Sequence, residues 1–318
     1  MIQLIGGSGF VGTRLISLLG QKNCNNLDKN NSQKYPKITK IGDIRNIDSL
    51  IFDNNIKCVV LLAAEHKDDV EPKSLYYDVN VEGTQNVLNK MDEKGIKNLI
   101  FTSTVAIYGL DKKNPNENFP SDPFNHYGKS KWNAEKIIKK WYDQDPDDKT
   151  VVIVRPTVIF GENNRGNVYN LFKQIMTKKF LMIGDGHNKK SLSYVGNVVS
   201  FIKNRIEKSD EGYYVYNYSD KPDFSMIELI NKIKYLTNIK ILNIKIPYLI
   251  GIIGGYFFDI VAKISGKKLP ISSIRIKKFC ATTQFDSKKM LEIFKPPYTI
   301  DKGLEKTLNN EFLNNKNR

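Results

Sequence analysis

The sequence predicts an α/β protein in which a doubly wound parallel sheet is followed by a second, smaller lobe of mixed α/β structure. Short apolar, β-branched runs alternate with helical patterns through the first half of the 318 residues, and a glycine-rich turn directly follows the first run. Strands separated by helices form right-handed βαβ units, which give a parallel sheet covered on both faces. Because the alternation ends near residue 160, we expect one domain over residues 1–160. The second lobe is expected over 161–318, with some of its helices packed back on the first domain.

The individual elements follow from these patterns. Strands of the first domain are expected at residues 2–5, 24–27, 38–41, 58–63, 98–103 and 151–155. Helices between them are expected at 13–21, 46–54, 78–94 and 127–143. The second lobe is expected to hold helices near 167–178, 197–207, 225–237 and 247–264 and short strands near 180–183 and 214–218. A sheet of this kind binds its ligand at the carboxyl ends of its strands.

Composition narrows the classes of function. Lysine and arginine number 49 against 34 acidic residues, and segment 263–289 holds eight of the basic ones, Lys267 and Lys268 included, against Asp286 alone. No zinc finger, helix-turn-helix or RNA-recognition pattern accompanies these charges, so no nucleic-acid partner is expected. The three cysteines are scattered without metal-ligand spacing, and no secretory signal precedes the first strand. We therefore expect reduced thiols, no metal site and a cytoplasmic location.

The turn at residues 5–12 (IGGSGFVG) is the strongest cofactor signal. Gly6, Gly9 and Gly12 follow the first strand at G-x-x-G-x-x-G spacing, and a predicted helix comes next. A dinucleotide pyrophosphate needs a tight turn and bare backbone N–H groups at a helix N-terminus. This combination of strand, glycine turn and helix predicts a dinucleotide site.

Asp28 closes the second strand, where a carboxylate can bind both ribose hydroxyls of NAD. NAD is therefore favoured, although the adjacent Lys29 leaves NADP open as the cofactor. Asp28 can also be interpreted as a turn residue of the Asn-rich stretch 25–31. Asp43 and Ile44 follow the third strand, where they could receive the adenine or begin a helix.

Tyr127 and Lys131 form a second chemical signal. They are four residues apart and so share one face of a helix. A lysine ammonium near a phenol favours the phenolate, which can take a proton from a sugar or alcohol hydroxyl while the neighbouring carbon gives up hydride. The strand at 98–103 ends in Thr102-Ser103-Thr104, whose hydroxyls could share that proton. A Y-x-x-x-K pair alone is equally typical of an exposed helix face.

With these motifs, the chain resembles the extended short-chain dehydrogenase/reductase family, and within it the nucleotide-sugar epimerases and dehydratases of the UDP-galactose 4-epimerase type. The resemblance covers nearly the whole chain. The resemblance rests on residues 6–12, 42–44, 62–64, 80–84, 101–104, 108–109, 127–131 and 155–156. It implies a Rossmann domain that binds NAD and a substrate lobe that binds a nucleotide sugar.

The resemblance also implies residue roles. Thr104 takes the place of the catalytic Ser/Thr, Tyr127 that of the acid/base, and Lys131 that of its partner, which also holds the nicotinamide ribose. The expected cofactor-binding residues are Gly6, Gly9, Phe10, Val11, Gly12, Asp28, Asp43, Ile44, Ala63, Ala64, Asn80 and Lys131. The expected substrate-binding residues are Ser103, Lys190 and Asn167, the last from an amide-rich segment, 161–170, that could equally be a polar loop and helix cap.

Two departures from the family's patterns bear on the reaction. Dehydratases place an Asp-Glu pair directly after the catalytic threonine, whereas this chain has Val105 and Ala106, which disfavours dehydration. Where many 4-epimerases carry R-D-[FY]-x-H-V-x-D, residues 190–197 read KSLSYVGN. Lys190 can still reach a diphosphate as a point charge, but without the bidentate geometry of arginine.

We therefore expect an NAD-dependent nucleotide-sugar 4-epimerase that acts on a UDP-hexose or UDP-N-acetylhexosamine through a transient 4-keto sugar. One alternative is an NAD(P)H-dependent 4-keto reductase of a nucleotide deoxysugar, which uses the same three residues. The other is a non-catalytic dinucleotide-binding protein. The resemblance suggests a homodimer through helices 78–94 and 127–143.

The apolar run at 246–258, whose helical pattern extends to residue 264, allows two interpretations. It can lie on an anionic membrane leaflet, as an apolar helix flanked by cations does. It can instead pack into the core of the second lobe, while some of the cations in the basic segment face the diphosphate of the substrate. Packing is favoured, because that lobe must bury a core and Gly251, Gly254 and Gly255 suit a surface helix poorly. Contact with a membrane surface is therefore not expected.

Overall fold

A seven-stranded parallel sheet forms the centre of the computed structural model, which describes residues 1–318 except 68–69, 209–210, 242–243, 267–268, 270–271 and 315–318. The strand order is β10-β6-β5-β4-β1-β2-β3. The strands are β1 (Ile2–Ile5), β2 (Cys24–Asp28), β3 (Thr39–Ile41), β4 (Cys58–Leu61), β5 (Asn98–Thr102), β6 (Thr150–Pro156) and β10 (Gly212–Tyr218). All neighbouring pairs are parallel, which confirms the predicted doubly wound sheet.

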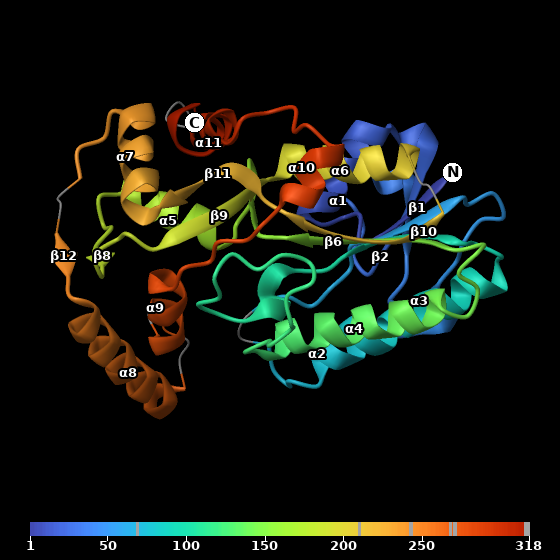
Figure 1. Cartoon of the computed structure of the whole chain (residues 1–318), viewed down its shortest axis with the longest axis horizontal. Helices are drawn as coiled ribbons and strands as arrows, with labels where there is room; N and C mark the ends of the chain where they lie inside the picture. Colours follow the sequence, from blue (N-terminus) through green and yellow to red (C-terminus); the bar gives the residue numbers. More distant parts are fainter. Residues whose placement is uncertain (68–69, 209–210, 242–243, 267–268, 270–271, 315–318) are drawn as a thin grey trace.

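Helices cover both faces of this sheet (Figure 1). α1 (Phe10–Leu19) and α6 (Val195–Glu207) pack together on one face, and α3 (Gly83–Glu93) and α4 (His126–Tyr142) on the other. The short α2 (Leu75–Tyr77) and a π-helical turn lead into α3. Every residue of β4 and β6 is buried. Burial on both faces explains why these strands have nearly continuous apolar, β-branched sequences.

Two details of the first domain differ from the prediction. The helix expected at 46–54 is a single 3₁₀ turn over Ile47–Ser49, because the Asn46 side chain caps its start and Leu50 already leaves the helical conformation. The boundary expected at residue 160 also does not divide the sheet. β10 lies beyond it in sequence but pairs with β6 along its whole length.

The second lobe is built from two small sheets and the remaining helices. One sheet has the order β11-β9-β7, with β11 (Asp220–Ser225), β9 (Lys189–Tyr194) and β7 (Val158–Phe160). The other pairs β12 (Lys245–Ile246) with β8 (Met182–Ile183). The helices are α5 (Asn167–Met176), α7 (Met226–Thr237), α8 (Tyr248–Ser265), α9 (Ser273–Cys280), α10 (Lys288–Ile293) and α11 (Ile300–Leu308). This arrangement confirms the predicted mixed α/β lobe.

The helix α8 contradicts the prediction that its apolar run packs into the second lobe. Its buried residues are Gly251, Ile252 and Gly255, whereas most of its large apolar side chains are exposed. Gly251 and Gly255 therefore lie on the inner side of the helix, whereas a Cβ at Gly254 would meet no atom within 4 Å. Lys267 and Lys268, which belong to the basic segment singled out in the sequence, lie outside the described residues.

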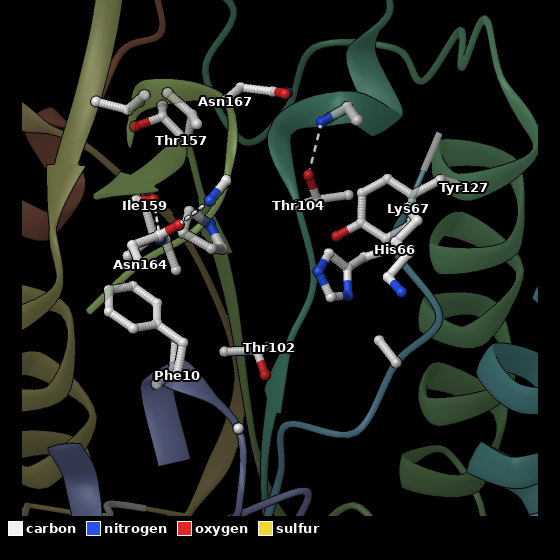
Figure 2. Close-up of a pocket in the computed structure, with 18 of the residues that line it drawn as sticks. Phe10, His66, Lys67, Thr102, Thr104, Tyr127, Thr157, Ile159, Asn164 and Asn167 are labelled. Atoms are coloured by element: carbon white, nitrogen blue, oxygen red, sulfur yellow. Dashed lines mark hydrogen bonds between the residues drawn. The ribbon is translucent and has the colours of Figure 1, made fainter. Parts of the chain in front are cut away.

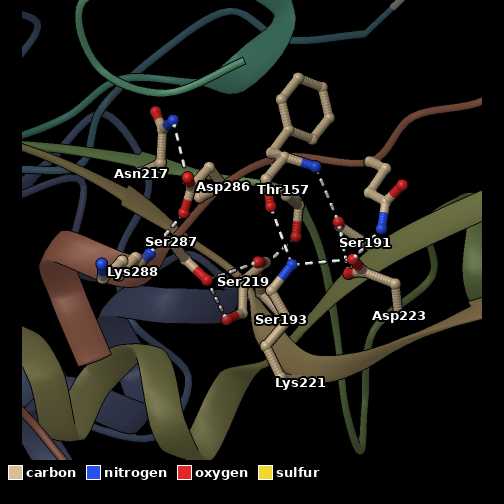
Figure 3. A network of polar contacts seen from close by, with 12 residues as sticks. Thr157, Ser191, Ser193, Asn217, Ser219, Lys221, Asp223, Asp286, Ser287 and Lys288 are labelled. Atoms are coloured by element: carbon tan, nitrogen blue, oxygen red, sulfur yellow. Dashed lines mark hydrogen bonds and ion pairs between the residues drawn. The ribbon is translucent and has the colours of Figure 1, made fainter. Parts of the chain in front are cut away.

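A polar network connects the two sheets through the chain just before α10 (Figure 3). Ser191 of β9 accepts a hydrogen bond from the Phe285 backbone N–H at 3.1 Å and donates to Asp223 at 2.6 Å. Asn217 of β10 donates to the carbonyl of Asp286 at 3.1 Å. This segment therefore joins the large sheet to the small one and fixes the second lobe beside the strand ends.

A buried ion pair fastens α4 to the sheet. Arg155 of β6 donates to Glu135 of α4 from Nη2 at 2.6 Å and from Nε at 3.0 Å, and the two side chains are 6% and 3% exposed. Arg155 also donates to the hydroxyl of Tyr108 at 2.6 Å, and Tyr108 donates to Asn217 at 2.8 Å. Ser103 completes the cluster by donating to Glu135. Charges buried this deeply are tolerated because each has a partner.

The substitution Arg155→Met is expected to lower the free energy of unfolding by about 3–5 kcal/mol, because it leaves the Glu135 carboxylate buried without its cation. Urea unfolding followed by circular dichroism measures this. Lys139→Met is the matched control, since it breaks the half-exposed ion pair with Asp143 on the outer side of the same helix and should cost less than about 1 kcal/mol. Equal losses of unfolding free energy in the two variants would show that the buried ion pair stabilises the protein no more than the exposed one.

Candidate active site

The glycine turn lies where the strand order of the sheet reverses, between β1 and β4. Gly6 has a φ of +86°, and a Cβ atom there would lie 2.5 Å from the backbone nitrogen of Ala63. A Cβ at Gly12 would lie 2.4 Å from the Cα of Gly7. Glycine is thus required for this close approach of β4, the turn and α1. The arrangement leaves the N-terminus of α1 at the crevice where open α/β sheets bind their ligands.

A cavity of about 2350 Å³ extends from this turn to the second lobe. Its lining includes these residues predicted for the cofactor: Gly6, Gly9, Phe10, Val11, Gly12, Asp28, Asp43, Ile44, Ala63, Ala64 and Lys131. It also includes Ser103, Thr104, Tyr127, Asn167 and Lys190. Pockets for one small molecule usually measure roughly 300–1,000 Å³, so this cavity has room for a dinucleotide and a substrate together.

The two acidic residues predicted near the cofactor are both held by neighbours. Asp28 accepts from the backbone N–H of Ser8 at 3.0 Å and from that of Asn30 at 2.9 Å, one bond to each carboxylate oxygen. Each oxygen can accept a further hydrogen bond, as binding of a ribose would require. Asp43 forms an ion pair with Arg45 at 2.6 Å, and this hydrogen-bonded arginine lowers the pKa of Asp43.

Tyr127 and Thr104 meet at the centre of the cavity wall. Figure 2 shows the Tyr127 hydroxyl pointing into the cavity, beside Thr104 and His66. Thr104 begins the 3₁₀ turn Val105–Tyr108, and its Oγ1 accepts from the backbone N–H of Ala106 at 3.1 Å. This bond leaves the threonine hydroxyl proton available to another acceptor. Thr104 and Tyr127 thus line the same cavity and lie beside each other in it.

Lys131 lies one turn after Tyr127 on α4 and is 1% exposed. Its Nζ lies 3.8 Å from the centre of the Phe101 ring. Burial lowers the pKa of Lys131 to about 7, against the opposing attraction of Glu135 one turn further along the helix. Because water is excluded around it, the charge of this ammonium acts on its neighbours with little screening.

Asn80 supports the site from behind and is not among the described residues that line the cavity, so its place among the cofactor-binding residues stays a prediction. Its side chain is 1% exposed and both accepts from and donates to the backbone of Glu65, at 2.8 and 2.9 Å. It also donates to Ser130 Oγ at 2.8 Å. The amide thereby ties the loop after β4 to α4, and both its N–H groups are used in doing so.

Two residues predicted to bind substrate line the cavity but use their polar atoms within the protein. The hydroxyl of Ser103 donates to the buried Glu135. The Nζ of Lys190 donates to the carbonyls of Lys278 at 2.9 Å and Ala281 at 2.6 Å. Burial lowers the pKa of Lys190 to about 8. Lys190 is thus held by backbone carbonyls in this structure, and its contact with a diphosphate stays a prediction.

His66 and Lys67 were not predicted to line the cavity, whereas some cations of segment 263–289 were expected to face the diphosphate of the substrate, without being named. His66 and Lys67 face the cavity from the loop after β4 (Figure 2), and Arg275 and Lys278 line it from α9. The first pair could have been found from its position a few residues past the end of a buried parallel strand. Among the described lining residues there are eleven lysines and arginines but three acidic residues. Such a cavity attracts anionic ligands.

Comparison with known proteins gives close relatives over the full length. The model of the NAD dependent epimerase/dehydratase family matches residues 2–218. The chain is 55% identical to the N-acetyl-alpha-D-glucosaminyl-diphospho-ditrans,octacis-undecaprenol 4-epimerase of Escherichia coli O157:H7, covering 99% of this chain and 96% of the relative. It is 27% identical to the UDP-glucose 4-epimerase of Vibrio cholerae, covering 100% of this chain and 97% of the relative.

Solved structures share the fold. MoeE5 in complex with UDP-glucuronic acid and NAD superposes with a TM-score of 0.76 at 19% identity over 97% of both chains. The UDP-glucose 4-epimerase of Thermus thermophilus in complex with NAD gives 0.73 at 17% identity, over 97% of this chain and 98% of the other. At such identities the likeness is one of architecture.

Because the pKa of Lys131 is about 7, its effect on the free energy of unfolding is expected to depend on pH. The native state holds this proton less tightly than the unfolded chain, so the lysine destabilises the fold most at low pH and ceases to do so near pH 10.5. Lys131→Met should therefore raise the free energy of unfolding at about pH 6.5, by on the order of a few kcal/mol, and the gain should vanish toward pH 10.5.

Urea unfolding at a series of pH values measures this difference. Lys129→Met is the control, since it removes an exposed lysine from the same turn of α4 and should change stability little at any pH. A Lys131→Met protein that is less stable than the wild type at pH 6.5 would contradict the lowered pKa of Lys131.

Proposed function

Since this chain belongs to the NAD dependent epimerase/dehydratase family, we propose that it is an NAD-dependent 4-epimerase of a diphosphate-linked N-acetylhexosamine. The observation that carries the proposal is the meeting of Thr104, Tyr127 and Lys131 in one cavity with the glycine turn. The relatives from Escherichia coli and Vibrio cholerae are both 4-epimerases, which supports isomerisation over net reduction.

The residues fit the cofactor that the family uses. The glycine turn and the N-terminus of α1 would hold the pyrophosphate, and Asp28 would accept hydrogen bonds from the adenine ribose. Lys131 would hold the nicotinamide ribose. NAD held by these residues would supply a reversible hydride acceptor for the hydrogen at C4 of the sugar.

The protein supplies the proton chemistry. Tyr127 would take the proton of the 4-hydroxyl while the C4–H bond breaks, which leaves a 4-keto sugar. The buried ammonium of Lys131 would stabilise the phenolate before that transfer, and the Thr104 hydroxyl would donate a hydrogen bond to the substrate oxygen. After the keto sugar has rotated in the cavity to present its other face, Tyr127 would return the proton to the same oxygen. The reaction consumes no cofactor and changes the configuration of C4 alone.

We assign the diphosphate to the positively charged side of the cavity formed by Arg275 and Lys278. N-acetylglucosamine joined through diphosphate to a polyprenol is the favoured substrate, because the Escherichia coli relative acts on such a lipid and shares 55% of its sequence with this chain. A UDP-hexose or UDP-N-acetylhexosamine is the second candidate, and the Vibrio cholerae relative, named a UDP-glucose 4-epimerase, supports the UDP-linked class. Parallel assays with the two substrates at equal concentration test this choice, and faster turnover of the UDP sugar would reverse it.

The expectations for assembly and location are carried forward as proposals. We propose a homodimer through α3 and α4, which lie side by side on one face of the sheet. Light scattering of the purified protein tests it. A cytoplasmic location is supported by three cysteines that form no disulfide with one another in the described structure.

Tyr127→Phe is expected to reduce turnover by about 10²–10⁴-fold while leaving NAD affinity unchanged, because it removes only the transferable proton. The assay follows interconversion of the sugar without added cofactor, which also separates an epimerase from a reductase. Tyr142→Phe, at the far end of the same helix, is the control and should keep full activity. More than a few per cent residual activity in Tyr127→Phe would show that another group transfers the proton.

Asp28→Ala is expected to weaken NAD binding by on the order of tenfold, as loss of a charged hydrogen bond does, and to narrow the preference for NAD over NADP. Cofactor titration by calorimetry measures both affinities. Asp28→Asn removes the charge but keeps one side-chain oxygen, which can accept from only one of the Ser8 and Asn30 backbone N–H groups, so circular dichroism of both variants checks that the turn is intact. Tighter binding of NADP than of NAD by the wild type would reject the role given to Asp28.

A further inference from the structure

The helix α8 presents a continuous apolar stripe on the surface. Leu249, Ile253, Phe257, Ile260 and Ile264 are between 59% and 82% exposed. Their spacing of three and four residues places them on one face of the helix. Figure 1 shows α8 at the far end of the second lobe, away from the seven-stranded sheet. Monomeric proteins rarely expose contiguous apolar surface of this kind unless something docks on it.

The opposite side of α8 packs tightly on the protein, and its glycines make this possible. A Cβ at Gly251 would lie 2.5 Å from the side chain of Ile183 in β8. A Cβ at Gly255 would lie 2.9 Å from the Cα of Ser273 in α9. These glycines therefore allow α8 to approach β8 and α9 closely. The exposed stripe is held in a fixed orientation.

The helix is apolar enough to raise the question of a membrane crossing. It has 18 residues with a mean hydropathy of 1.4, but an α-helix of that length spans only about 27 Å, slightly less than a bilayer core. The chain on both sides of α8 also packs into a single body, since α11 contacts β9 and α10 contacts β10. A crossing would separate these partners. The geometry fits a helix that lies along a surface.

Charges around the stripe suit an anionic surface. Lys245 and Lys263, near the two ends of α8, are exposed. Lys277 of α9 is also exposed, and its Nζ reaches the Tyr256 hydroxyl on α8 at 2.9 Å. The single acidic residue of α8, Asp259, is directed toward α9, where it accepts from a backbone N–H at 3.3 Å. Apolar burial and attraction of lysines to anionic headgroups act together in such helices.

We propose that the exposed stripe of α8, together with Lys263 and Lys277, is a docking surface for an anionic lipid bilayer. The elements on which α8 packs, β8 and α9, also form part of the wall of the active-site cavity. Ile183 of β8 and Ile276 of α9 both line that cavity, and both contact the inner glycines of α8. Docking would thus hold the cavity beside the headgroups, where a polyprenyl diphosphate is found. Only this last consequence rests on the proposed function.

Co-sedimentation of the full-length protein with vesicles tests the docking surface without requiring turnover. The wild type should bind vesicles that contain phosphatidylglycerol and bind phosphatidylcholine vesicles more weakly, with affinity falling as salt is raised. Leu249→Ser/Ile253→Ser/Phe257→Ser and Lys263→Gln/Lys277→Gln should each weaken binding at least about tenfold. Both variants should keep the epimerase activity of the wild type toward a UDP-N-acetylhexosamine if that sugar is turned over.

Matched controls place the same changes elsewhere. Ile41→Ser/Ile51→Ser/Tyr235→Ser removes exposed apolar groups from other surfaces, and Lys136→Gln/Lys140→Gln removes two exposed lysines from α4. Both should bind vesicles as the wild type does, and thermal unfolding checks that every variant is folded. Wild-type protein that stays in the supernatant, or binding unchanged by the α8 substitutions, would overturn the proposal. So would a homodimer, seen by light scattering, that the α8 substitutions dissociate.

Discussion

The ion pair between Glu135 and Arg155 is the interaction on which the site depends most. Tyr127, Lys131 and Glu135 follow one another at intervals of four residues and so share the inner face of α4. Because Glu135 is fixed to β6 by hydrogen bonds from Nε and Nη2 of Arg155, the rotation of the helix about its axis is fixed as well. That rotation directs Tyr127 toward the cavity and buries Lys131 beneath it. The position of Tyr127 in the proposed proton transfer thus depends on an ion pair two helical turns away, at Glu135.

A second constraint is the exclusion of side chains where the strand order reverses. The turn after β1 approaches the loop after β4 so closely that any Cβ at Gly6 would collide with Ala63. The loop after β4 is in turn tied to α4 through Asn80. Cofactor turn, loop and helix therefore form one connected unit. Within it, the burial of Lys131 costs stability, as is common where a site needs a group with an unusual pKa.

The sequence predicted those parts of the fold whose partners are adjacent in the chain. The first six strands and the pair Tyr127 and Lys131 were found because each has a local pattern. The entry of β10 into the sheet, and the carbonyls that bind Lys190 from about ninety residues downstream, could not be found in this way. The glycines of α8 were misjudged for the same reason. A glycine weakens an isolated helix but permits close packing against Ile183, and only the packed partner decides which effect prevails.

The central claim is that one cavity removes hydrogen from C4 of a sugar and returns the same hydrogen to its other face. The most direct measurement is turnover of N-acetylglucosamine diphosphate-linked substrate that carries deuterium at C4, without added cofactor, followed by mass spectrometry of the product sugar. We expect the epimerised sugar to keep its deuterium while the protein consumes no cofactor. Product in which the label is lost to solvent, or no product until a reduced cofactor is added, would contradict it.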